Sequence, residues 1–155
     1  MSFSDGRVVL GPGEGKTIKG LGQSVTFKAV KEDTRGAYSL LEANFTGGGT
    51  TQHIHHAEEE AFYVLEGEVN VKVGERAIRA AAGAFVLIPR GTVHALWNVG
   101  ATPRKLLIIT SPAGFEQLVA ELAGDSEIDL AGLNEQRSMA IAQKYNMEIV
   151  GPPLG

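Results

Sequence analysis

The sequence predicts an all-β protein that carries α-helices at its C-terminal end, and two observations lead to this fold class. Twenty glycines punctuate the chain. They separate short segments rich in Val, Ile, Phe, Tyr and Thr, which is typical of an antiparallel sandwich or barrel. After Ser111-Pro112 the pattern changes, and apolar residues begin to recur at helical spacing. A chain of 155 residues is long enough for one domain with a proper core.

Ten short segments have the composition of β-strands, bounded by turn residues. They are Arg7–Leu10, Ser24–Ala29, Ala37–Phe45, Gln52–His55, Ala61–Glu66, Glu68–Val73, Arg76–Ala80, Ala84–Ile88, His94–Asn98 and Lys105–Thr110. Two joins between them are interpreted as tight hairpins, one at Glu66-Gly67-Glu68 and one at Gly74-Glu75. The run Gly47-Gly48-Gly49 is interpreted as a flexible connection.

A first helix is expected directly after the last strand. Ser111 suits the N-cap position of a helix, and Pro112 suits its first helical position. Apolar residues then follow at i, i+3, i+4 and i+7, which is the stripe of an amphipathic helix. These residues are Phe115, Leu118, Val119 and Leu122.

A second helix is expected over about Leu130–Tyr145, before an extended segment over Met147–Val150. Its apolar face would consist of Leu133, Ala140 and Ile141. We expect both helices to pack against the strands or against a partner subunit. The expected organisation is therefore a single domain with an N-terminal arm (residues 1–23), a β-barrel (24–111) and a C-terminal helical extension (112–155).

Composition excludes several classes of partner and site. The net charge of −4 and the scattered Lys and Arg residues argue against a nucleic-acid partner. The absence of cysteine excludes disulfides, iron–sulfur clusters and thiolate zinc sites. The start of the chain has no signal-peptide pattern, and no apolar segment approaches the ~20 residues that span a bilayer. We therefore expect a cytoplasmic protein without a membrane partner.

Three of the four histidines lie in the stretch TQHIHHAEEEAFYVLEG, residues 51–67. Residues two apart in a strand point to the same face, so His53 and His55 project together, and Glu60 opens the next strand. Two imidazoles and one carboxylate at one point form a site that Fe, Mn, Ni, Co, Cu or Zn accepts. Alone, the His-x-His pair or the run of glutamates would indicate only a solvated surface. The fourth histidine, His94, favours a metal site.

The spacing of these residues resembles the two motifs of the cupin superfamily. Residues 47–67 read as Gly, five residues, His-x-His, four residues, Glu, six residues, Gly. Residues 83–98 read as Gly, five residues, Pro-x-Gly, two residues, His, three residues, Asn. No motif position departs from the pattern. The fifteen residues between Gly67 and Gly83 match the spacing of small microbial cupins.

The resemblance implies a single-domain cupin jelly-roll β-barrel that holds one divalent transition metal. It also implies the metal ligands, which are His53, His55, Glu60 and His94. Such a set leaves two positions of an octahedron open for a small molecule. The motif residues Gly67, Gly83, Pro89 and Gly91 are interpreted as structural turn residues. Small cupins commonly form homodimers, so a homodimer is expected, with the N-terminal strand and the C-terminal helices as candidate contacts.

Residues around the ligands receive weaker interpretations. His56 faces away by alternation and is interpreted as an exposed or loop residue, and Glu58 and Glu59 as a solvated acidic turn. Tyr63 and Trp97 fall on the face opposite the ligands and are expected in packing or a dimer contact. Other apolar residues either line a substrate pocket or simply fill the barrel. They are Phe62, Val64 and Leu96, which share the ligand face, and, as weaker candidates, Phe27, Tyr38 and Leu40.

The segments AFYVLEGE, IPRGTVHALWN and SPAGFEQ resemble quercetin 2,3-dioxygenase-like cupins. This resemblance implies a metal-dependent dioxygenase acting on a small enol, flavonol or aromatic or polyketide-type compound. It also implies a catalytic role for Glu60, which would accept a proton from a substrate hydroxyl. Two alternatives stay open: a metal-dependent cyclase or isomerase of polyketide or sugar-like substrates, and a non-catalytic cupin that binds a small ligand.

Overall fold

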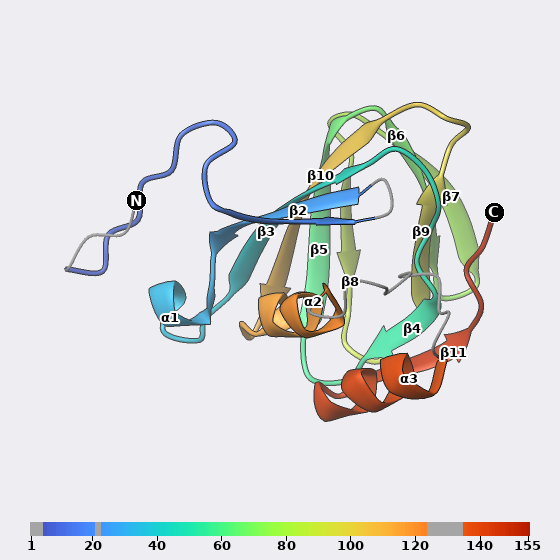
Figure 1. The fold of residues 1–155 in the computed structure, drawn as a ribbon. Helices are drawn as coiled ribbons and strands as arrows, with labels where there is room; N and C mark the ends of the chain where they lie inside the picture. The colour runs from blue at the N-terminus through green and yellow to red at the C-terminus, as the bar shows by residue number, and fades with distance from the viewer. Residues whose placement is uncertain (1–4, 21–22, 124–134) are drawn as a thin grey trace.

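The computed structural model describes residues 5–20, 23–123 and 135–155, and these form two antiparallel β-sheets that face each other (Figure 1). One sheet has the order β1-β2-β3-β10-β5-β8. Its strands are β1 (Lys16–Gly20), β2 (Gln23–Ala29), β3 (Ser39–Phe45), β10 (Arg104–Ser111), β5 (Glu59–Glu66) and β8 (Phe85–Ile88). The other sheet has the order β11-β4-β9-β6-β7. Its strands are β11 (Met147–Gly151), β4 (Gln52–His55), β9 (His94–Asn98), β6 (Glu68–Val73) and β7 (Arg76–Ala81).

This arrangement confirms the predicted all-β jelly-roll character and corrects one part of it. Within the described residues the two sheets share no ladder of hydrogen bonds, so the strands form a sandwich rather than a closed barrel. Three helices accompany the sheets in the described part of the chain: α1 (Lys31–Thr34), α2 (Phe115–Ala123) and α3 (Glu135–Lys144). No described helix has the length and apolar character needed to cross a membrane.

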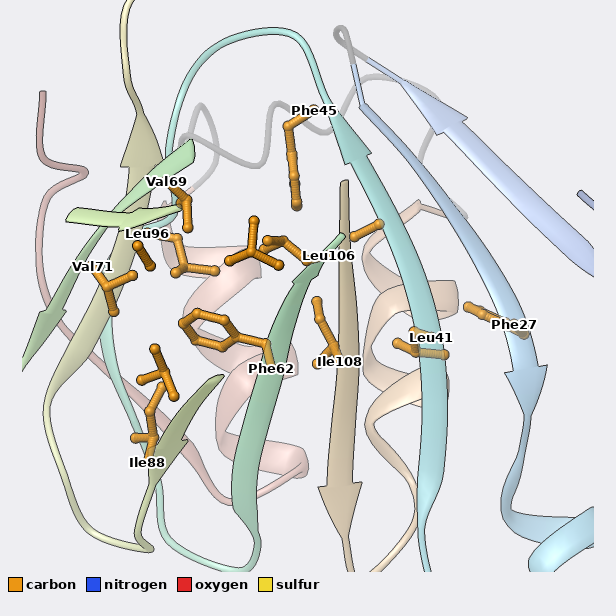
Figure 2. Packing of buried hydrophobic residues seen from close by; sticks show 14 residues of the cluster. Phe27, Leu41, Phe45, Phe62, Val69, Val71, Ile88, Leu96, Leu106 and Ile108 are labelled. Carbon is orange, nitrogen blue, oxygen red and sulfur yellow. The ribbon is translucent and has the colours of Figure 1, made fainter. Parts of the chain in front are cut away.

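The core lies between the inner faces of the two sheets. Alternate residues of each strand point inward, as the pleat requires, so that in β3 and β10 every second side chain is buried. Figure 2 shows Phe62 of β5 pointing toward Val71 and Leu96 on the opposite sheet. The buried cluster consists of Phe27, Leu41, Ala43, Phe45, Phe62, Val64, Val69, Val71, Ala80, Val86, Ile88, Leu96, Leu106 and Ile108.

Most predicted strands are confirmed, three of them with the predicted bounds, which are β4, β6 and β9. The predicted strand Arg7–Leu10 is wrong, because this segment contributes only an isolated bridge at Val8. The strand at the N-terminal side is β1 instead, which pairs with β2 over its whole length. Its sequence KTIKG has one apolar residue, as suits the exposed edge of a sheet, and gave no alternation to detect.

One of the two predicted hairpins is correct. Gly74 has a φ of 59° and joins β6 to β7, which pair directly. Gly67 does not form a hairpin, because β5 pairs with β10 and β8 whereas β6 pairs with β7 and β9. The chain crosses there from one sheet to the other. Gly67 has a φ of 72°, and a Cβ at this position would collide with the carbonyl oxygen of Pro103, so the crossing requires glycine.

The C-terminal helices are present, but the first one begins later than predicted. Ser111 is the last residue of β10, and its hydroxyl donates a hydrogen bond to the carbonyl oxygen of Ala37 at 2.8 Å, so it is not a helix cap. In the second helix Ala140 is exposed, whereas Ile141 and Ala142 are buried. Leu133 and the predicted start at Leu130 lie outside the described residues.

Candidate metal centre

The four histidine and glutamate side chains of the two motifs converge at one place between the sheets. His53 and His55 project from β4 on the same face, and His94 opens β9 as the register partner of His53. Glu60 reaches the same place from β5 of the other sheet. One ligand atom from each of these residues lies within 4.8 Å of the others, and all four side chains are buried. The cluster therefore has the composition and compactness of a metal site.

Backbone carbonyls determine which nitrogen of two histidines carries a proton. His53 Nδ1 donates to the carbonyl oxygen of Thr51 at 2.7 Å, and His94 Nδ1 donates to that of Thr92 at 2.9 Å. A carbonyl oxygen can only accept, so Nδ1 bears a hydrogen in both rings, which leaves Nε2 of each ring as the atom that can bind a metal. His94 Nε2 lies 2.9 Å from Glu60 Oε2. Nε2 of His94 and Oε2 of Glu60 therefore lie together at the place where the cluster could hold a cation.

The third histidine leads to the same conclusion. Both ring nitrogens of His55 are buried, and neither has an aligned hydrogen-bond partner. His55 Nδ1 lies 2.8 Å from Glu58 Oε1, and His55 Nε2 lies 3.2 Å from Glu60 Oε2, but in both contacts the angles are poor for a hydrogen bond. Unsatisfied buried nitrogens beside a carboxylate and two further imidazoles fit a divalent ion of borderline softness.

Burial and neighbouring charges shift the protonation of these groups in opposite directions. Burial, together with the neighbouring His94 and His55, lowers the pKa of His53 to about 3, so that its ring is neutral. Burial also acts to lower the pKa of His55, but the contacts with Glu58 and Glu60 outweigh it and raise that pKa to about 9. Burial would raise the pKa of Glu60, but His55 and His94 hold it well below its usual range. Glu60 is therefore an ionised carboxylate at neutral pH.

The three residues next to the ligands have different positions. His56 points outward, where its Nε2 lies 2.9 Å from Glu148 Oε2, and Glu59 is exposed, which agrees with the interpretation of both as surface residues. Glu58 is different, because its carboxylate lies next to the ring of His55 and is largely shielded from solvent. Alternation did not reveal this contact, since Glu58 lies in the turn between β4 and β5, where the period of two does not apply.

A second residue that sequence reasoning did not place at the site is Phe115, the first residue of α2. Its ring stands nearly perpendicular to that of His55, with 5.5 Å between the ring centroids. Helix α2 lies toward the same end of the sheets as α3 (Figure 1). The sequence showed Phe115 as part of an apolar helical stripe, but nothing in that stripe indicated that its neighbour would be a histidine of the candidate site.

Helix α2 is held in this place by Glu116, whose side chain is buried. The carboxylate accepts hydrogen bonds from the backbone N–H of Lys31 at 2.8 Å, from the backbone N–H of Gly114 at 3.2 Å and from the hydroxyl of Ser39. These groups belong to the start of α1, the turn before α2 and the start of β3. The contacts fix the start of α2, and with it the ring of Phe115.

The residues proposed to line a substrate pocket are divided by the structure into two groups. Phe62, Val64, Leu96 and Phe27 are buried in the core cluster. Leu40 faces the outer side of its sheet, since Ser39 and Leu41 point inward, and Tyr38 is exposed. Both line a cavity of about 450 Å³ beside Val8 and Leu10 of the N-terminal segment, and no candidate ligand lines that cavity.

Comparisons with known proteins agree with the fold and the motifs. The family described as Cupin domain matches residues 43–110. An uncharacterized protein of Methanocaldococcus jannaschii is 31% identical over 64% of this chain and 75% of that protein. Quercetin 2,3-dioxygenase of Bacillus subtilis is 27% identical over 79% of this chain, which spans only 37% of that enzyme. The crystal structure of an RmlC-like cupin from Shewanella frigidimarina superimposes with a TM-score of 0.60, at 21% identity, over 70% of this chain and 94% of that one.

Proposed function

The chain belongs to the cupin family, and from this premise we propose that it is a metal-dependent enzyme, most simply a dioxygenase acting on a small enol, flavonol or aromatic or polyketide-type compound. The observation that carries the proposal is the convergence of three buried imidazoles and the Glu60 carboxylate, with His94 Nε2 at 2.9 Å from Glu60 Oε2 and His94 Nδ1 donating to a backbone carbonyl. The distant likeness to a quercetin 2,3-dioxygenase supports the choice of reaction. The proposed ligands are His53, His55, Glu60 and His94.

Each residue of the site has a separate task in this proposal. The carbonyls of Thr51 and Thr92 hold the rings of His53 and His94 with Nε2 directed inward. A bound divalent ion, one of Fe, Mn, Ni, Co, Cu or Zn, supplies Lewis acidity and, where it is redox-active, a path for electrons to dioxygen. The ionised Glu60 carboxylate accepts the proton of a substrate hydroxyl. The surrounding apolar side chains exclude water from the site.

Metal analysis and oxygen uptake test the proposal in two steps. The purified protein is expected to contain one divalent metal per chain, which His53→Ala, Glu60→Ala and His94→Ala remove. The loaded protein is then screened for oxygen consumption with flavonols, diketones and polyketide intermediates. Full metal content in all three variants would refute the site. Turnover under strict anaerobiosis would refute the dioxygenase and assign a cyclase or isomerase, and tight binding without turnover would assign a binding protein.

We also propose that the protein forms a homodimer through the outer face of its six-stranded sheet. Register places two rows of apolar side chains side by side on this face, across β8, β5, β10 and β3. The rows are Phe85, Tyr63 and Leu107, and Leu87, Ala61, Ile109 and Leu40. At about 200 Å² per aromatic side chain, Tyr63 and Phe85 at 44% and 63% exposure leave roughly 200 Å² in water. Leu87 and Ile109 are 48% and 42% exposed and extend the patch further.

The size and charge of this face suit a second copy of the chain. The four strands have 7, 8, 8 and 4 residues, which at about 3.3 Å per residue and about 4.8 Å between strands give roughly 400 Å² of flat sheet, the same order as the ~800 Å² per partner of a stable interface. Lys105 at the rim already pairs with Glu66 at 3.3 Å and Glu42 at 3.9 Å. Lys105 balances one of the two carboxylates, which limits the charge of this group to one net negative unit per chain.

Sedimentation measurements test this interface. The wild-type protein is expected to be a dimer at micromolar concentration, and the double variant Leu87→Glu/Ile109→Glu a folded monomer with unchanged metal content. Val150→Glu is the matched control, because Val150 is 45% exposed on β11 of the other sheet. A monomeric wild type, or a dimer that survives the double variant, would exclude this face.

A further inference from the structure

We propose that Glu58 is a positioning residue of the metal centre, whose carboxylate accepts a hydrogen bond from His55 Nδ1 when an ion is bound at Nε2 and thereby directs His55 Nε2 toward that ion. The inference rests on the proposed metal site but adds a residue outside the ligand set. Its starting point is the distance of 2.8 Å between His55 Nδ1 and Glu58 Oε1. At 15% exposure the Glu58 side chain is largely shielded from water, unlike that of Glu59.

The turn between β4 and β5 is built so that Glu58 comes back onto His55. β4 ends at His55 and β5 begins at Glu59, which leaves three residues to reverse the chain. The turn is fixed at its start by two backbone hydrogen bonds: Gly91 N–H donates to the carbonyl of His55 at 2.9 Å, and His56 N–H donates to the carbonyl of Asn146 at 3.0 Å. A side chain held by such a turn loses little conformational freedom when it makes a contact.

The other two histidines show why His55 needs this partner. His53 and His94 each donate Nδ1–H to a backbone carbonyl two residues earlier in the chain. His55 has no such carbonyl contact among the described residues, and Glu58 is the group that lies at its Nδ1. Without an acceptor at Nδ1, the ring of His55 has no preferred tautomer and can present N–H rather than a lone pair to the ion. Groups that orient ligating histidines in this way commonly change metal affinity 10–100-fold when removed.

Charge gives Glu58 a second effect on the same ligand. A divalent ion with Glu60 as the single anionic ligand leaves one positive charge in a buried site. The Glu58 carboxylate, one imidazole ring farther out, balances that charge. It also makes His55 a stronger donor than His53 or His94, because a carboxylate polarises an imidazole N–H more than a carbonyl does.

Metal affinity measured by competition with a chelator tests the role, with Co²⁺ and Zn²⁺ as the probes. We expect Glu58→Ala to weaken the Kd 10–100-fold, Glu58→Gln to recover most of the loss through its amide carbonyl, and the exposed Glu59→Gln to match wild type. Imidazole ¹⁵N NMR of the Zn²⁺-loaded proteins supplies a readout that a purely structural defect does not change. His55 is expected to be protonated at Nδ1 next to Glu58 and to populate both tautomers in Glu58→Ala.

The outcomes separate this inference from the metal site itself. A wild-type protein that binds neither ion refutes the metal centre and the role of Glu58 together. A wild-type protein that binds the ions while Glu58→Ala keeps the same Kd and the same His55 tautomer refutes Glu58 alone. A Glu58→Gln protein as weak as Glu58→Ala, with an intact fold by circular dichroism, refutes orientation by hydrogen bonding.

Discussion

Replacing Glu116 tests whether one buried carboxylate holds the helix that places Phe115 against His55. Glu116→Ala removes the acceptor for the Ser39 hydroxyl and for the backbone N–H groups of Lys31 and Gly114. The contact with Ser39 is buried, so its loss costs the upper value for a hydrogen bond to a charged group, about 3 kcal/mol. The two backbone contacts are half-buried and partly replaced by water, so they add about 1 kcal/mol together.

The free energy of unfolding is therefore expected to fall by about 4 kcal/mol in Glu116→Ala, and by about half as much in Glu116→Gln, whose amide keeps one acceptor. Urea denaturation of the metal-free proteins measures both values. Glu32→Ala is the control, because Glu32 is exposed on the neighbouring helix α1. A Glu116→Ala protein within about 0.5 kcal/mol of wild type, the range of ordinary surface substitutions, would refute the anchoring role.

Three further expectations follow from the packing around the site. Ni²⁺ at a hundred times its Kd should stabilise the wild type by about 2.7 kcal/mol in thermal unfolding, and His94→Ala should abolish the effect. Phe62→Ala should cost about 3–5 kcal/mol in urea while metal content stays intact, because Phe62 is 1% exposed in the core; an unchanged stability would make it a pocket residue instead. Phe115→Ala should speed the loss of bound metal to a chelator, because the Phe115 ring packs against that of His55. Stopped flow measures this rate, and an unchanged rate would contradict a role of Phe115 at the site.

The cluster of candidate ligands could be predicted partly from a local rule and partly from the resemblance to the cupin motifs. His53 and His55 share a face through the two-residue period of a strand, and the matching motif around His94 identified the partner. Core residues such as Phe62 and Leu96 follow from the same alternation, since they lie two residues from Glu60 and His94. Where a strand has a clear apolar period, as in β6 with Val69, Val71 and Val73, its bounds were also correct.

The errors arise where local pattern does not determine the tertiary partner. Turn chemistry at Gly67 and Gly74 is alike, with positive φ at both, yet one joins paired strands and the other crosses between sheets. Glu58 was interpreted as solvated because the side-chain direction in a three-residue turn depends on the hydrogen bonds that fix the turn. Phe115 and Glu116 act through residues far away in the sequence, and a helical stripe does not name those partners.

The position of the four candidate ligands gives the proposed metal a structural consequence that neither sheet alone would show. His53, His55 and His94 come from β4 and β9 of one sheet, whereas Glu60 comes from β5 of the other. Among the described residues the two sheets have no shared ladder of hydrogen bonds, and apolar packing and the hydrogen bond from Arg104 of β10 to Asn98 of β9 connect them. A divalent ion bound by all four residues therefore links the two sheets directly at the end where α2 packs. For this reason the stabilisation by Ni²⁺ and its loss in His94→Ala report on the cohesion of the whole sandwich, not only on the order of one loop.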